Sequence, residues 1–119
     1  MGGHVILGNM KTTIDLARVA LALSDPIRLQ ILDLLVAGRD ETCYSPLYTE
    51  QPTAICPSDL LRKLGIVTAS KLSYHLSELQ RAGLIQERRQ GKRIYYTPNL
   101  ETLSAFVEDC QQRYLASVL

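Results

Sequence analysis

Apolar residues recur at helical spacing along most of the chain. Residues 11–23 carry them on two faces, which favours a helix that is buried on two sides or shared with a partner chain. Residues 26–37 form a second apolar stripe, preceded by Asp25, a natural N-cap, and Pro26, which suits a first helical turn. Gly38 follows the stripe and predicts the end of this helix.

Two shorter helical segments, separated by a tight turn, are expected over residues 57–83. The first begins at Pro57 and ends at Gly65, and the second follows Thr68, a good N-cap, and ends at Gly83. One face of the second segment is a stripe of leucines, namely Leu72, Leu76 and Leu79. This succession of helix, turn and helix predicts a helix-turn-helix.

A β-hairpin is expected next, over residues 84–97, because strand-prone segments flank a tight turn at Gln90 and Gly91. Side chains alternate along a strand, so one of Tyr95 and Tyr96 must face inward. Asn99 can cap a last helix. That helix covers 100–118, with an apolar stripe of Leu100, Leu103, Val107, Cys110, Tyr114 and Val118.

The order of these elements, α-α-α-α-β-β-α, predicts a mainly α (α+β) winged helix-turn-helix. The length of 119 residues fits a single domain spanning 1–119, in which residues 1–10 are a flexible tail. The two-faced helix 11–23 and the striped helix 100–118 are the expected dimerisation elements. No apolar run approaches the roughly 18 residues of a membrane span. No nucleophile–base–acid set or phosphate loop indicates an enzyme.

Residues 39–56 form a long segment with neither a helical nor a strand pattern. They hold Cys43 and Cys56, two of the three cysteines of the chain. Loops of this length without secondary structure are uncommon in compact domains and are often functional. An odd number of irregularly spaced cysteines does not make a secreted disulfide framework, so we expect reduced thiols in a cytoplasmic protein.

The net charge of +1 conceals a concentrated basic block. Eight lysine and arginine residues lie between positions 62 and 93, against only Glu78 and Glu87. Charge runs are most often solvated helix faces. This block, however, coincides with the helix-turn-helix and the hairpin, where it is an electrostatic footprint for a polyanion.

A helix that enters a major groove needs side chains that can hydrogen-bond to base edges. The second helix offers Thr68, Ser70, Lys71, Ser73, Tyr74 and His75. For His75 the expected roles are a contact with phosphate or base, or packing between helices. The hairpin tip offers Arg88, Arg89, Gln90, Lys92 and Arg93 to phosphates or a minor groove. We therefore predict binding to double-stranded DNA. A winged-helix protein-interaction module that does not read DNA is the alternative, and the basic block argues against it.

Four stretches together resemble the ArsR/SmtB-type family of metal- and stress-sensing repressors, namely "LSDPIRLQILDLL", "SDLLRKLG", "SKLSYHLSELQRAGLI" and "RRQGKRIYYT". The resemblance runs from about residue 12 to 115. It implies a homodimeric repressor that places two recognition helices in successive major grooves and releases DNA when an effector binds. Two-fold symmetry then predicts an operator that is an imperfect inverted repeat.

One metal site of that family uses cysteines at the start of the helix before the turn. Cys56 matches the first of them, and Ser58 stands where the second would be. Soft ions select thiolates, so our leading hypothesis is As(III)/Sb(III), or another soft metal ion, held by Cys43, Cys56 and Cys110. The effector is not an obligatory cofactor. Cys110 lies in an apolar stripe, where cysteine more often serves as core than as ligand.

A second hypothesis needs no metal. A disulfide between two cysteines would strain the DNA-binding geometry, so that an oxidant or reactive sulfur species would release DNA. Cys56 lies at the start of a helix, where the dipole favours a thiolate. Oxidant-dependent release without metal would favour this redox hypothesis over the first.

Overall fold

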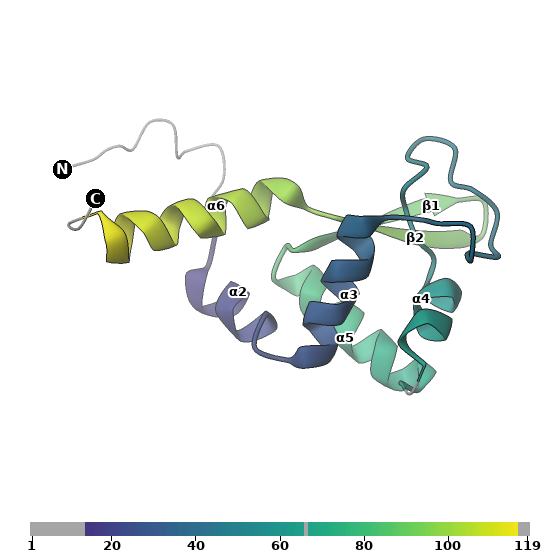
Figure 1. Cartoon of the computed structure of the whole chain (residues 1–119), viewed down its shortest axis with the longest axis horizontal. Helices are drawn as coiled ribbons and strands as arrows, with labels where there is room; N and C mark the ends of the chain where they lie inside the picture. The colour runs from purple at the N-terminus through teal and green to yellow at the C-terminus, as the bar shows by residue number, and fades with distance from the viewer. Residues whose placement is uncertain (1–13, 66, 117–119) are drawn as a thin grey trace.

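The computed structural model describes residues 14–65 and 67–116 (Figure 1). Its elements are, in chain order, α2 (Leu16–Ala22), α3 (Pro26–Ala37), α4 (Pro57–Leu64), α5 (Ala69–Arg81), β1 (Ile85–Gln90), β2 (Arg93–Pro98), α6 (Leu100–Cys110) and the π-helical turn η1 (Gln111–Leu115). The order confirms the winged helix-turn-helix. The expected tail over 1–10 lies outside the described residues.

Two of the predicted helices are shorter than expected. The first was expected over 11–23, but α2 begins only at Leu16, after its N-cap Asp15. The last was expected over 100–118, but regular α-helix ends at Cys110 and passes into the π-helical η1. Apolar spacing locates a helix well but does not fix its ends, which depend on caps and local packing.

Side-chain caps determine where most of the helices begin. Asp15, Asp25, Thr68 and Asn99 each accept a backbone N–H of the following first turn, which satisfies donors that have no partner inside the helix. Helix α4 differs, because Cys56 occupies its N-cap position and makes no side-chain cap bond. The thiol of Cys56 is therefore left for other partners.

The hairpin of β1 and β2, called the wing below, gains a short extension from the long loop. The two strands pair antiparallel, with Gln90 opposite Arg93, and Gly91 takes a positive φ of 63° in the turn. Ile55 then bridges the free edge of β2, since it exchanges two backbone hydrogen bonds with Tyr96, at 3.1 and 2.8 Å. The end of the loop is thus bound to the wing as a minimal third strand.

Both faces of the wing are covered, which explains why Tyr95 and Tyr96 are both buried. Tyr96 belongs to the main core, which the helices build around buried leucines and isoleucines such as Ile31, Leu60 and Leu79. Tyr95 faces the other way and belongs to a small second cluster, formed with Tyr48, Ala54 and Cys56. This second cluster lies between the wing and the long loop.

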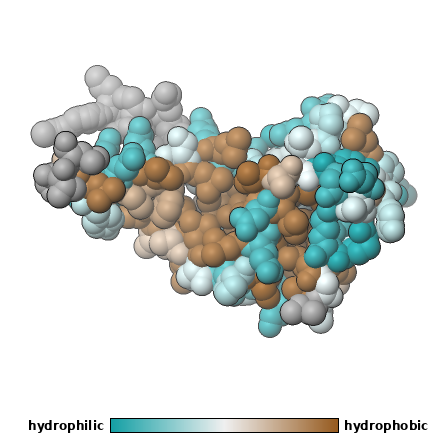
Figure 2. Space-filling view, viewed as in Figure 1, coloured by the Kyte–Doolittle hydropathy of each residue, from teal (hydrophilic) through white to brown (hydrophobic). Residues whose placement is uncertain are grey.

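Helix α6 lies against α2 at the end of the molecule opposite the wing (Figure 1). Much of the apolar stripe of α6 and η1 remains uncovered, because Leu100 and Val107 of α6 and Tyr114 of η1 are 62%, 55% and 65% exposed. Figure 2 shows hydrophobic surface along α6 and across the middle of this face, and hydrophilic surface gathered toward the wing end. Among the described residues, no helix is long and apolar enough to cross a membrane.

Candidate DNA-binding surface and cysteine loop

Helices α4 and α5 form the helix-turn-helix, and the leucines of α5 hold it to the core. Leu72, Leu76 and Leu79 are buried, as the apolar stripe predicts. The outer side of α5 carries exposed Ser70, Lys71, Ser73 and Tyr74, the last with 58% of its surface exposed. These polar groups therefore stand where a major groove can receive them. Thr68 is exposed as well, but its side chain caps α5 by accepting the Lys71 N–H.

His75 was predicted to contact DNA, and the structure corrects this. It is only 2% exposed and faces the interior of the domain. The Arg28 guanidinium donates to its Nδ1 at 3.0 Å and also donates to the carbonyl groups of Ala22 and Leu21, at 2.7 and 3.4 Å. Since Nδ1 is the acceptor, the proton of a neutral His75 lies on Nε2, which is buried and has no partner among the described residues. His75 joins α5 to α3 and α2 instead of reading bases.

We expect His75 to make the folded protein sensitive to mild acid. Burial, the largest cause, lowers the pKa of His75; the Asp25 carboxylate raises it by a smaller amount, and the charges of Arg28 and Lys71 lower it further. The unfolded chain therefore takes up a proton near pH 6.5 that the folded chain resists. The free energy of unfolding should fall as the pH drops below about 6.5, and replacement by asparagine should flatten this dependence. Urea unfolding between pH 7.5 and 5.5 measures this dependence. An equal change in the free energy of unfolding with pH for the original chain and the asparagine variant would contradict the prediction.

The wing presents fewer available cations than the sequence suggested. Arg89, Lys92 and Arg93 are exposed, although Arg89 pairs with Glu87 at 2.9 Å. Arg88 is half-buried and donates to Gln86 at 2.9 Å. These exposed side chains lie around the tip of the hairpin and can meet phosphates.

The side chain of Gln90, which the sequence assigned to DNA, is engaged by the long loop. Its Nε2 donates to the Leu47 carbonyl at 3.0 Å, and its Oε1 accepts from the backbone N–H and the hydroxyl of Thr49, both at 2.9 Å. The sequence placed Gln90 at the hairpin tip correctly, but it carried no sign that the loop would fold back onto it.

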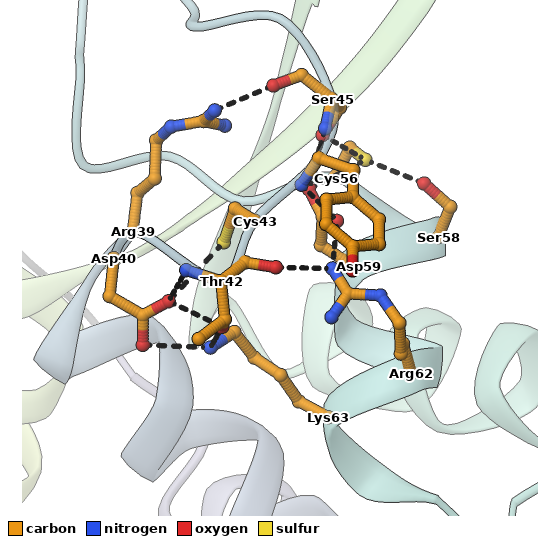
Figure 3. A network of polar contacts seen from close by, with 11 residues as sticks. Arg39, Asp40, Thr42, Cys43, Ser45, Cys56, Ser58, Asp59, Arg62 and Lys63 are labelled. Carbon is orange, nitrogen blue, oxygen red and sulfur yellow. Dashed lines mark hydrogen bonds and ion pairs between the residues drawn. The ribbon is translucent and has the colours of Figure 1, made fainter.

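The segment of residues 39–56, called the cysteine loop below, is organised around Asp59 of α4 (Figure 3). Its carboxylate accepts the backbone N–H groups of Tyr44 and Ser45, at 2.9 and 3.3 Å, and a close hydrogen bond from the Ser45 hydroxyl. Arg62 pairs with it at 2.6 Å and also donates to the Thr42 carbonyl. One carboxylate thus anchors the first half of the loop.

The protonation of Asp59 follows from these contacts. Burial by itself would raise its pKa, since the side chain is only 2% exposed. The hydrogen bonds from Ser45, from the Tyr44 and Ser45 amides and from Arg62 outweigh burial and hold the pKa of Asp59 well below its usual range. Asp59 is therefore a carboxylate at neutral pH, and a buried one that depends on its partners.

Cys56 lies inside this polar arrangement. Its Sγ is 2.8 Å from the Ser45 hydroxyl, 3.0 Å from the Ser58 hydroxyl and 3.6 Å from Oδ2 of Asp59. The side chain is buried and at the same time borders the apolar cluster that includes Tyr48 and Tyr95. Any group added to this sulfur must displace one of these neighbours.

The other two cysteines lie elsewhere. Cys43 is buried at the edge of the main core, with its Sγ 3.9 Å from Asp40 Oδ1, and Cys110 is half-buried on α6. In residues 14–65 and 67–116, no group of three or more cysteine, histidine, aspartate or glutamate side chains is placed to hold a metal ion. One folded chain therefore does not assemble the predicted site of Cys43, Cys56 and Cys110.

Most neighbours of Cys56 carry little signal in the sequence. Ser45 and Tyr48 lie in a segment without periodicity, so no pattern assigns them a direction. Asp59 offered only a weak signal, because an acidic residue in the first turn of a helix is commonly explained by its favourable interaction with the helix dipole. The helix dipole accounts for an acidic residue at the surface, but it gives no reason to expect that the Asp59 carboxylate is buried beneath a loop.

Comparison with known proteins agrees with this geometry. A family described as "Helix-turn-helix domain" matches residues 23–88. The chain is 35% identical over 82 residues to the transcriptional repressor SdpR of Bacillus subtilis (strain 168), and the aligned region covers 69% of this chain and 73% of SdpR.

Solved structures extend the similarity to the wing and last helix. An ArsR-like transcriptional regulator from Rhodococcus sp. RHA1 is 26% identical with a TM-score of 0.65, over 96% of this chain and 93% of that one. A homodimeric winged helix-turn-helix DNA-binding domain from Mycobacterium bovis is 27% identical with a TM-score of 0.57, over 84% of this chain and 83% of that one.

Proposed function

The chain belongs to the ArsR/SmtB-type family of winged helix-turn-helix transcriptional regulators, and we propose that it is a repressor whose operator DNA is released by a thiol-reactive effector. The observation that carries the proposal is the position of Cys56. It occupies the N-cap position of α4, the helix that supports α5, and its thiol is surrounded by Ser45, Ser58 and Asp59. Chemistry at this sulfur therefore acts directly on the helix-turn-helix.

DNA binding divides between two surfaces of the domain. Ser70, Lys71, Ser73 and Tyr74 on the outer side of α5 set the sequence preference in a major groove. Arg89, Lys92 and Arg93 of the wing contact phosphates and add affinity that does not depend on sequence. The protein acts in the cytoplasm, where its operator is.

A second copy of the chain completes the molecule. The exposed apolar side chains of α6 and η1, namely Leu100, Val107 and Tyr114, favour burial against a partner. A two-fold dimer brings two α5 helices to one face of the duplex, so that the operator is an imperfect inverted repeat.

Arsenite or antimonite is the leading effector. Each thiol that binds arsenite forms an S–As bond while one As–OH group leaves as water with the thiol proton, and three thiols complete the site. Cys56 supplies the first, and Cys43 and Cys110 are the candidates for the others. Because one chain does not gather the three thiols, complete ligation needs a rearranged loop or a cysteine of the second copy.

A redox switch is the second candidate, and the location of Cys43 favours it. Cys43 lies beside Asp40, which pairs with Lys63 of α4, while Cys56 lies beside Asp59 one turn earlier on the same helix. Both thiols thus border the same short helix. A peroxide would oxidise them to a disulfide, and its two oxygens would leave as two waters with the thiol protons.

The experiment that tests the proposal is a DNA-release titration. A duplex selected from a random library by the reduced protein serves as operator. Arsenite, antimonite, cadmium, zinc and peroxide are added in turn to the complex, with release followed by fluorescence anisotropy. Release by arsenite or antimonite alone selects the metalloid, and release by peroxide alone selects the redox switch. Retention of the duplex under all five reagents would overturn the proposal.

We expect Lys92→Ala to weaken binding to all duplexes by a similar factor. One phosphate contact accounts for a slope of about −0.9 in a plot of log affinity against log salt, so the slope should become shallower by about 1. Ser73→Ala should instead reduce the difference between operator and unrelated duplex. Titrations at several salt concentrations measure both quantities, and unchanged non-specific binding of Lys92→Ala would contradict the wing assignment.

A further inference from the structure

The cysteine loop covers the outer face of the wing (Figure 1). Tyr95 of β2 points to this face, where its ring stacks on Tyr48 of the loop with centroids 5.3 Å apart. Ala54 and Cys56 complete the buried cluster. The wing is therefore packed between the helical core on one face and the loop on the other.

Hydrogen bonds fix the loop to the wing at two points. The Tyr95 hydroxyl donates to the Pro46 carbonyl at 2.6 Å. At the end of β1, the side chain of Gln90 bonds with Leu47 and Thr49. We call this set the loop–wing contact, and it is made by Pro46, Leu47 and Thr49 with Gln90 and Tyr95. Gln90 immediately precedes the turn that carries Lys92, so the contact holds the phosphate-binding tip.

The same stretch of loop is bound to Cys56. Ser45 contacts the Cys56 sulfur and Asp59, and the next residue, Pro46, accepts the hydrogen bond from Tyr95. Proline has a fixed φ, so only the ψ angle of Pro46 is left to absorb a displacement between Ser45 and the Pro46 carbonyl. Displacement of Ser45 therefore shifts the carbonyl that positions Tyr95.

We propose that Tyr95 and Gln90 are positioning residues for DNA binding, and that the loop–wing contact transmits the state of Cys56 to the wing. The proposal rests on the proposed function and specifies its regulation. A group added to the buried Cys56 sulfur displaces Ser45, the Pro46 carbonyl leaves Tyr95, and the wing loses its fixed orientation. The phosphate contacts of the wing then weaken while α5 keeps its place against the core.

A single-thiol chain tests the transmission. In a Cys43→Ser/Cys110→Ser variant, the Cys56 thiolate attacks the sulfenyl sulfur of methyl methanethiosulfonate. The new S–S bond carries an S-methyl group, methanesulfinate leaves, and the thiol proton goes to solvent. Amide hydrogen exchange and operator affinity are then compared with the unmodified form of the same variant. We expect faster exchange in Arg93–Pro98, unchanged exchange in Ala69–Arg81, weaker operator binding and a shallower salt dependence.

The outcomes separate the two proposals. Release of DNA with unchanged exchange in the wing would overturn the transmission route and leave the proposed function standing. No release after complete modification would count against control at Cys56 itself. Faster exchange in the wing without release would show that the wing orientation does not set affinity, which also overturns the route.

A pair of hydroxyl deletions tests the contact without chemical modification. Tyr95→Phe removes the bond to Pro46 but keeps the ring, and we expect operator affinity to fall roughly three- to tenfold, as the loss of one hydrogen bond allows, with a shallower salt dependence. Tyr96→Phe is the matched control, because the hydrogen bonds between Tyr96 and Ile55 are made by the backbone and survive the change. A general defect in folding would lower operator affinity but would not make its salt dependence shallower. Equal affinities and salt slopes for the two variants would overturn the positioning role.

Discussion

Replacement of Cys56 by serine is expected to leave operator binding intact and to abolish release by the effector. Serine is smaller but similar in shape, and its Oγ can accept the backbone N–H groups at the start of α4 that the cysteine leaves without a side-chain cap. The contacts with Ser45 and Ser58 can also form to oxygen. Folding and DNA affinity should therefore persist, while the atom that reacts with arsenite or peroxide is gone.

The expected size of this effect is large. Allosteric coupling between a ligand and its effector commonly changes affinity by about 5- to 150-fold, and Cys56→Ser should reduce that ratio to 1. Fluorescence anisotropy with and without effector measures the ratio, and urea unfolding verifies the fold. Cys110→Ser supplies the comparison, since it impairs the arsenite response only if Cys110 is the third ligand. Normal induction of Cys56→Ser would refute both the metalloid and the redox hypothesis.

Replacement of Asp59 by alanine is expected to destabilise the folded protein by about 2–3 kcal/mol. Breaking a buried ion pair costs about 3–5 kcal/mol when the remaining charge stays buried. The Arg62 side chain is 37% exposed, so water recovers part of that loss. The amides of Tyr44 and Ser45 lose their acceptor as well. Urea unfolding at pH 7 measures the difference from the unmodified chain.

Asp40→Ala is the matched control for this change. Asp40 also carries a strongly lowered pKa, first because of its hydrogen bond with Lys63, but its side chain is 48% exposed and solvent screens the pair. Little change in stability is expected there. If both variants lost the same free energy of unfolding, burial of Asp59 would not be the cause of its larger expected contribution to stability.

The Asp59 effect should also depend on pH. The folded pKa of Asp59 lies below the unfolded value of about 3.9. Its contribution to the free energy of unfolding is therefore fully present above that value and is lost as the pH falls through the folded pKa. The stability difference between the original chain and Asp59→Ala should narrow below about pH 4.

Several elements of the fold followed from short-range signals. Asp25 with Pro26 and Gly38 determined both ends of α3, and Thr68 and Asn99 determined the starts of α5 and α6. The exposed groups Ser70, Lys71 and Tyr74 stand on the outer side of α5 because the leucine stripe fixes its inner side. These signals act within one or two helical turns, so the sequence displays them directly.

His75 shows the limit of that reasoning. Its position on α5 is next to exposed Tyr74, and polar character suggested a role at the surface. Arg28 comes from a helix far away in the sequence, and its hydrogen bond to Nδ1 of His75 offsets the cost of burying this polar ring. Arg88 and Gln90 were likewise assigned to DNA, although Arg88 is half-buried with one nitrogen on Gln86 and Gln90 is bonded to the cysteine loop.

By itself, the sequence determined the winged helix-turn-helix, and it predicted a basic DNA-binding surface and a functional role for the loop that carries Cys43 and Cys56. Only the tertiary structure decided that the three cysteines do not gather into one site within the described chain, that Asp59 anchors the loop, and that the loop packs on the outer face of the wing. The physical reason is that helix caps and apolar stripes are local, whereas the partners of a buried polar group come from wherever the chain folds back.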